Sequence, residues 1–161
     1  MQFIKTTIPE IKALCDIYNY YIFETINTLY TKEMTEEIFT KQFLSSKKRF
    51  TTFTIYLDDI IAGFISLTQY KARDAYDTTA EVTLYFDKQY TGKGMGNEAF
   101  RFIENYAKEN DFHTLIGVVC TENLHSIRLC EKNNFIKCAH LKEAGKKFDR
   151  FLDVVFFQKI L

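Results

Sequence analysis

Half of the glycines in this 161-residue chain are crowded together, at Gly92, Gly94 and Gly96. Ala80–Phe86 before them is rich in residues typical of a strand, and Met95–Lys108 carries apolar residues at helical spacing. A turn from a strand into a helix presents unpaired backbone N–H groups at a positive helix terminus. Because glycine lacks a Cβ, those amides can wrap closely around an oxyanion such as phosphate. The cluster therefore predicts either an anion site or a tight strand–helix turn.

Two common phosphate-binding motifs do not match this cluster. A Walker loop needs Gly-Lys followed by Ser or Thr, but Lys93 is followed by Gly94. A dinucleotide fingerprint needs GxGxxG, and here the spacing is GxGxG. It also needs an acidic residue at the end of the next strand, where Val119 and Cys120 stand.

Composition narrows the class of protein further. The length suits a single domain covering residues 1–161, and 21 basic against 21 acidic residues leave no net field for nucleic acid or an acidic membrane. The longest apolar stretch, Ile60–Leu67, is too short to span a membrane, and the N-terminus has no signal-peptide core. The four cysteines lack metal-ligand spacing, so we expect reduced thiols, no bound metal and a cytoplasmic location.

The residue pattern predicts elements in the order β α α β β β α β α β β, a mixed α/β sheet flanked by helices. Asp58-Asp59 is expected to be a hairpin turn, and the unbroken apolar run Leu115–Cys120 a central strand. The expected strands are Phe3–Lys5, Phe50–Leu57, Ile60–Tyr70, Ala80–Phe86, Leu115–Cys120, Ile136–Glu143 and Phe151–Gln158. The expected helices run from about Pro9 to Ile22, from Thr35 to about Leu44, over Met95–Lys108 and over Asn123–Lys132. A basic run near the C-terminus is interpreted as a solvated strand face: Lys142, Lys146, Lys147 and Arg150.

The strand, glycine loop and helix resemble the cofactor motif of the GNAT N-acetyltransferases, which bind acetyl-CoA with its pyrophosphate on the loop amides. The resemblance covers essentially the whole chain. The segments Lys71–Asp77, Thr79–Phe86, Asn123–Leu129 and Lys142–Val154 look like the phosphinothricin acetyltransferase branch. It implies the GNAT fold, in which the central sheet splays apart between its fourth and fifth strands.

The resemblance also assigns binding roles. A loop that contacts the substrate is implied for Arg73, Asp74, Ala75 and Tyr76. Acetyl-CoA is expected to contact Leu84, Tyr85 and Phe86 through their backbone, the glycine loop Gly92, Lys93, Gly94, Met95, Gly96 and Asn97, and the helix residues Asn123 and Ser126.

Two residues carry the expected chemistry. Glu81 matches the family's general base, which needs burial to raise its pKa toward neutrality; the alternative is a structural carboxylate. Cys130 stands where the family has a Tyr or His acid, and the alternative is a buried packing thiol. His125 lies about 140° round the helix from Cys130 and is not expected to substitute. Thr91, before the first motif glycine, and Asn134, where a glycine is usual, are further departures.

The resemblance implies acetyl transfer from acetyl-CoA to the amine of a small amino acid or analogue. Phosphinothricin, methionine sulfone and methionine sulfoximine are the family-like acceptors, and a homodimer is the expected assembly. Two alternatives remain: a GNAT that acts on another amine, such as a polyamine or a protein N-terminus, and a non-catalytic CoA-binding module.

Overall fold

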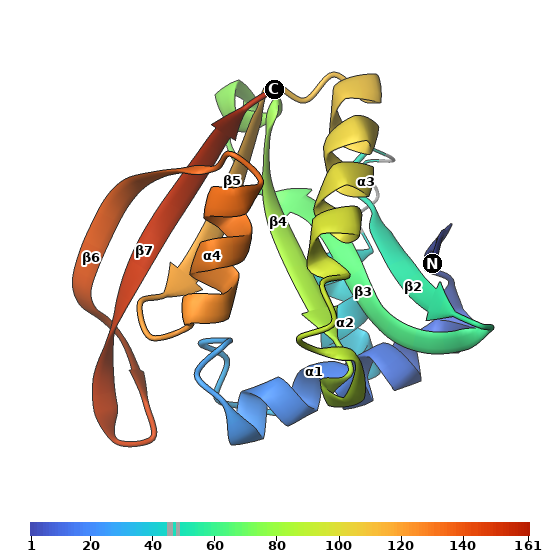
Figure 1. The fold of residues 1–161 in the computed structure, drawn as a ribbon, viewed down its shortest axis with the longest axis horizontal. Coiled ribbons are helices and arrows are strands. Elements are labelled where there is room, and N and C mark those ends of the chain that lie inside the picture. Colours follow the sequence, from blue (N-terminus) through green and yellow to red (C-terminus); the bar gives the residue numbers. More distant parts are fainter. Residues whose placement is uncertain (45–46, 48) are drawn as a thin grey trace.

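A mixed sheet runs through the molecule in the strand order β1-β2-β3-β4-β5-β7-β6, with helices on both faces (Figure 1). The computed structural model describes residues 1–44, 47 and 49–161. The strands are β1 Gln2–Lys5, β2 Thr52–Leu57, β3 Ile60–Gln69, β4 Thr79–Phe86, β5 Thr114–Cys120, β6 Ile136–Lys147 and β7 Arg150–Ile160. The helices are α1 Ile11–Glu24, α2 Glu36–Phe43, α3 Gly96–Glu109 and α4 Leu124–Lys132, with 3₁₀ turns at Ile8–Glu10, Asp74–Tyr76 and Lys88–Tyr90.

The direction of the strands changes at the centre of the sheet. Strands β1 to β4 are antiparallel neighbours, β4 and β5 are parallel, and β5 pairs antiparallel with β7. The parallel pair is joined by α3, as a crossover connection requires. The α/β class, the order of elements and the mixed sheet expected from the sequence are confirmed.

Two apolar cores lie on opposite faces of the sheet. Successive side chains of a strand point to opposite faces, so Phe64 joins the core under α1 and α2, while Ile65 joins the core under α3 and α4. Both side chains are completely buried. Burial of each such side chain is worth roughly 1.5–3 kcal/mol relative to exposure. Packing in the two cores thus holds the helices against the two faces of the sheet.

Short polar segments begin and end the elements as expected. The side chain of Thr35 accepts a hydrogen bond from the Ile38 amide and caps α2. Asp58 and Asp59 have φ angles of 47° and 63°, which suits a two-residue hairpin turn. The first helix starts later than expected, because Pro9 lies in a 3₁₀ turn and α1 begins at Ile11.

The last hairpin differs from the sequence expectation. Strand β6 continues to Lys147, four residues beyond the expected end at Glu143. The solvated-face interpretation of the basic run is wrong for Lys147, whose exposed fraction is 4%. Arg150 binds both carboxylate oxygens of Glu122, at 2.6 and 3.0 Å. Partners distant in the sequence, which periodicity cannot reveal, determine where the side chains of Lys147 and Arg150 lie.

Two features are absent from the described residues, a membrane-spanning helix and a cluster of metal ligands. Their helices include none that is long and apolar enough to cross a membrane. Within the same residues, His, Cys, Asp and Glu side chains form no group of three that could hold a metal ion.

Candidate active site

The sheet opens between β4 and β5. Over the described residues these strands pair at only three positions, of which Glu81 opposite Ile116 is the last. Beyond that point β4 still pairs with β3, and β5 still pairs with β7. The facing edges of the two strands therefore carry backbone N–H and C=O groups that a ligand can use.

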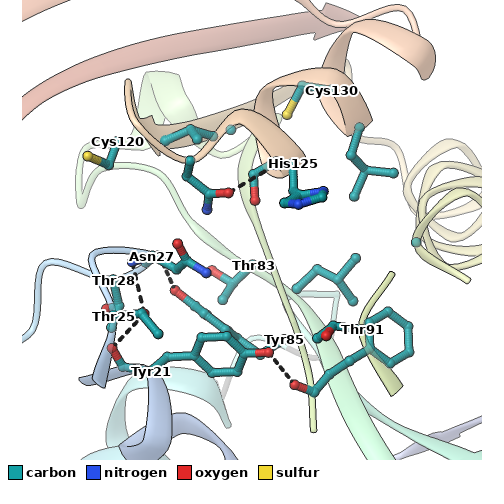
Figure 2. A pocket seen from close by; sticks show the side chains of 18 of the residues that line it. Tyr21, Thr25, Asn27, Thr28, Thr83, Tyr85, Thr91, Cys120, His125 and Cys130 are labelled. Carbon is teal, nitrogen blue, oxygen red and sulfur yellow. Dashed lines mark hydrogen bonds between the residues drawn. The ribbon is translucent and has the colours of Figure 1, made fainter. Parts of the chain in front are cut away.

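A cavity of about 1050 Å³ fills this opening. It is larger than the roughly 300–1,000 Å³ of a typical small-molecule site. Figure 2 shows two facing walls, with His125, Cys120 and Cys130 on one side and Tyr21, Asn27 and Tyr85 on the other. The first wall belongs to β5 and α4, and the second to α1, β4 and the segment after α1. The cavity joins sequence segments that are far apart in the chain.

The glycine loop lines one end of the cavity. Gly92 and Gly94 have φ angles of +75° and +81°, which side-chain-bearing residues adopt only at a cost. The first amide engaged in the α3 helix is that of Asn97, which donates to the carbonyl of Gly94. The amides before it point out of the helix start, as an anion site requires. Lys93 lies at the same end, with its ammonium group 5.3 Å from the centre of the Tyr90 ring.

Gly96 has a different function from the two glycines before it. A Cβ at Gly96 would lie 2.9 Å from Cδ2 of Leu129, so its absence lets α3 approach α4 closely. Asn97 strengthens that contact, because its side-chain oxygen accepts a hydrogen bond from Asn133 at 3.1 Å. Helix α3 starts at Gly96, one residue after the start at Met95 that the sequence predicts.

The start of α4 lines the cavity opposite the loop. The side-chain oxygen of Asn123 accepts a hydrogen bond from the Ser126 amide at 3.1 Å and caps the helix. This bond occupies the oxygen and orients the side chain, and the amide nitrogen of Asn123 remains a donor. Both residues line the cavity, as the resemblance implies.

Glu81 lies where the two strands separate. It is half-buried, and burial raises the pKa of its carboxyl group above the ordinary value. A second cavity of about 700 Å³ meets the first here, and the two share Tyr30, Gln42, Glu81 and Thr83. A carboxylate at the junction of two cavities, with a pKa moved toward neutrality, suits proton transfer between two ligands.

Cys130 lines the cavity from α4, but its side chain is packed against β5. Its exposed fraction is 3%, and a Cβ at Gly117 would lie 3.5 Å from its sulfur. Burial raises the pKa of this thiol to about 12. An acid of that strength donates poorly to an ordinary thiolate, whose conjugate acid has a pKa near 8.5. The surroundings of Cys130 therefore favour a packing role over the acid role that the resemblance implies.

Sequence reasoning missed an aromatic wall. The ring centres of Tyr18 and Tyr85 are 4.6 Å apart, and Tyr85 donates a hydrogen bond to the carbonyl of Asn27 at 2.9 Å. Tyr18 and Thr28 share a hydrogen bond of 3.1 Å between their hydroxyl groups. The position of Tyr18 in the helical pattern of α1 indicates only a buried helix face. The clue that could have been used is the phenolic groups, since a buried hydroxyl needs a partner.

The expected substrate loop is outside both described cavities. Arg73, Asp74, Ala75 and Tyr76 lie between β3 and β4, and neither described cavity includes them. The ring of Tyr76 instead packs edge-on against Tyr70 at 5.7 Å. By contrast, the other expected site residues all line the larger cavity.

The residues present fit acetyl-CoA. The cavity combines glycine amides suited to a pyrophosphate, open strand edges suited to an amide-containing arm, and the acidic side chain of Glu81 where the strands separate. The fold and the splayed strands thus define a protein of the acyl-CoA-binding class, with the cavity between β4 and β5 as its candidate site.

Comparison with known proteins agrees with this description. The family model described as "Acetyltransferase (GNAT) domain" matches residues 9–136. A phosphinothricin N-acetyltransferase of Streptomyces coelicolor is 28% identical over 94% of this chain and 91% of its own length. The crystal structure of a ribosomal-protein-alanine N-acetyltransferase from Brucella melitensis is 26% identical, with a TM-score of 0.93 over 100% of both chains. A phosphinothricin acetyltransferase from Sinorhizobium meliloti, solved in complex with acetyl-CoA, shares the fold at 19% identity, with a TM-score of 0.93 over 99% of this chain and 88% of its own.

The chain belongs to the GNAT acetyltransferase family. It is an acyl-CoA-dependent N-acetyltransferase, an enzyme rather than a binding module alone.

Proposed function

We propose that this enzyme transfers the acetyl group of acetyl-CoA to the α-amine of a small amino acid or analogue, of the phosphinothricin, methionine sulfone or methionine sulfoximine type. The observation that carries the proposal is the position of Glu81 between the two cavities. The larger cavity suits the cofactor, which supplies the activated acetyl group when bound. The smaller cavity leaves room for an acceptor of amino-acid size beside the same carboxylate.

The residues divide the work. The amides near Gly92 and Gly94 hold the diphosphate, and Asn123 donates to the arm that leads to the acetyl group. Glu81 takes the proton that the acceptor ammonium must lose before it can attack. Its raised pKa makes it a better base near neutral pH than an exposed glutamate would be.

A coupled assay of thiol release tests the proposal. Wild-type enzyme is given acetyl-CoA with each amino acid analogue, with a polyamine, or with a peptide that begins with alanine. We expect turnover with the amino acid analogues. The proposed acceptor class is wrong if only the polyamine or the peptide reacts.

The base assignment is tested by Glu81→Gln, which keeps the shape of the side chain and removes its basicity. Loss of a general base is expected to lower kcat/KM by roughly 10²–10⁴-fold, with CoA affinity unchanged. Glu109→Gln, at an exposed end of α3, is the matched control. If Glu81→Gln retains the activity of that control, Glu81 is not the base.

A protein N-terminus is the second candidate acceptor. The Brucella structure, whose name gives a ribosomal-protein alanine as its substrate, resembles this chain over its whole length. The alanine peptide in the same assay distinguishes this candidate from the first.

We also propose that the enzyme is a cytoplasmic homodimer. Strand β6 ends the sheet order, and the β6–β7 hairpin exposes the large apolar side chains of Ile136, Leu141, Phe148 and Phe151. Edge strands and apolar patches of this kind are normally covered. Sedimentation equilibrium tests the assembly, and a concentration-independent monomer mass contradicts it.

A further inference from the structure

A buried lysine lies outside the chemistry described so far. Lys147 is the last residue of β6, and its ammonium group donates to the carbonyls of Thr28 at 2.8 Å and Tyr21 at 3.3 Å. No carboxylate is paired with it among the described residues. Burial lowers the pKa of this lysine, as expected for a charge taken out of water. Such a group is tolerated only where its hydrogen bonds are well placed, so the contact with Thr28 is specific.

The segment that Lys147 holds is a wall of the active site. Residues 25–30 connect α1 to the chain before α2 and line the larger cavity. The Thr28 hydroxyl is bonded to Tyr18 at 3.1 Å and accepts from the Tyr30 amide at 3.3 Å. Thr28 therefore links the lysine to two aromatic residues of the cavity.

The hairpin touches the same segment at a second point. A Cβ at Gly145 would lie 3.0 Å from Cδ2 of Leu29, so the backbone of β6 packs directly on that side chain. The hairpin and the segment thus meet through one polar contact and one apolar contact. The hydrogen bond from Lys147 is the contact that fixes the orientation of residues 25–30, because hydrogen bonds depend on angle as well as distance.

This wall lies next to the expected base. Tyr30 and Glu81 both line the junction of the two cavities. Burial raises the pKa of the Tyr30 hydroxyl, its hydrogen bond with Gln42 lowers that pKa, and the charge of Glu81 raises it. A shift of residues 25–30 would therefore change the space in which an acceptor amine meets Glu81. The glycine loop is a separate segment of the cavity lining, and none of the contacts of Lys147 or Thr28 described above reaches it.

We propose that Lys147 is a positioning residue that shapes the acceptor side of the active site by holding residues 25–30 through the Thr28 carbonyl. It touches neither the acceptor nor the cofactor. Its effect on catalysis rests on the proposed function, whereas its effect on residues 25–30 does not.

The test compares Lys147→Met, which removes the donors at similar length, with Lys147→Gln, which retains an N–H donor. Lys146→Met is the control, since that neighbouring side chain is exposed. Hydrogen exchange of residues 25–30 is followed with CoA bound, and the KM values for acceptor and acetyl-CoA are measured separately. We expect faster exchange and an acceptor KM raised about tenfold in Lys147→Met, smaller changes in Lys147→Gln, and an unchanged KM for acetyl-CoA.

Two results would overturn the proposal. One is that residues 25–30 exchange their amide hydrogens at the wild-type rate in both Lys147 variants. The other is a parallel rise of both KM values, which indicates general loss of structure. If Lys147→Met does not fold, the same exchange rates and KM values are compared between the wild type and Lys147→Gln, and they decide the proposal. If the wild type acetylates none of the amines, the proposed function fails, and exchange alone still decides what Lys147 holds.

Discussion

Gly63 offers a sharp test of how tightly β3 and β4 are joined beside the active site. It pairs with Phe86 across the two strands. A Cβ at Gly63 would lie 2.3 Å from the carbonyl oxygen of Tyr85 and 2.8 Å from Cα of Phe86. Both are backbone atoms, which cannot rotate away as the end of a side chain can. Gly63→Ala must therefore push the strands apart and weaken their hydrogen bonds.

The size of the effect follows from these contacts. Overpacking of a well-packed interior costs about 1–3 kcal/mol, and a clash with backbone belongs at the upper end. For a domain of this size, each kcal/mol lowers Tm by roughly 2–4 °C. We therefore expect Tm of Gly63→Ala to fall by about 6–12 °C.

Gly117→Ala is the matched control for this experiment. A Cβ at Gly117 on β5 would lie 3.5 Å from the Cys130 sulfur, an ordinary contact distance, so its Tm should stay close to that of the wild type. Differential scanning calorimetry of the three proteins measures the difference. Equal Tm values for the two variants would refute the argument from backbone contact.

Three further outcomes are expected. Gly94→Val forces a β-branched residue to φ +81°, at a cost of about 1–2 kcal/mol. Calorimetry should therefore show CoA binding weakened about tenfold. Unchanged CoA affinity would contradict the assignment of this loop to CoA binding. Cys130→Ala should retain most of kcat, because a thiol with a pKa of about 12 is a poor acid; a hundredfold loss, about 2.7 kcal/mol, would restore the acid role. Burial raises the pKa of Glu81 in the folded state, so its contribution to stability is present at low pH and is lost as pH rises. Glu81→Gln should therefore raise Tm at pH 7 but not at pH values below about 4, where both states are protonated; equal Tm shifts at both pH values would exclude the linkage.

Much of the fold could be predicted because its signals are local. Asp58 and Asp59 form the expected turn, and Asn134 adopts the left-handed conformation, with φ 62°, that a residue replacing glycine there must adopt. The glycine loop could be predicted for the same reason, since Gly92 and Gly94 occupy backbone conformations that few other residues adopt. These features depend on the chain within a few residues of each position.

The parts that could not be predicted depend on partners far away in the chain. Lys147 carries the same charge as Lys146, and only the packing of the hairpin on residues 25–30 makes one buried and the other exposed.

The amino-acid sequence by itself determined the order of elements, the glycine-rich turn into α3 and the family, because backbone preference and hydrophobic period act over short distances. The tertiary structure decided which side chains are buried from solvent and which residues they then contact. Burial is the largest cause of the raised pKa values of Glu81 and Cys130 and of the lowered pKa of Lys147. Desolvation is a property of the assembled core, and it exists only once the sheet has brought those segments together.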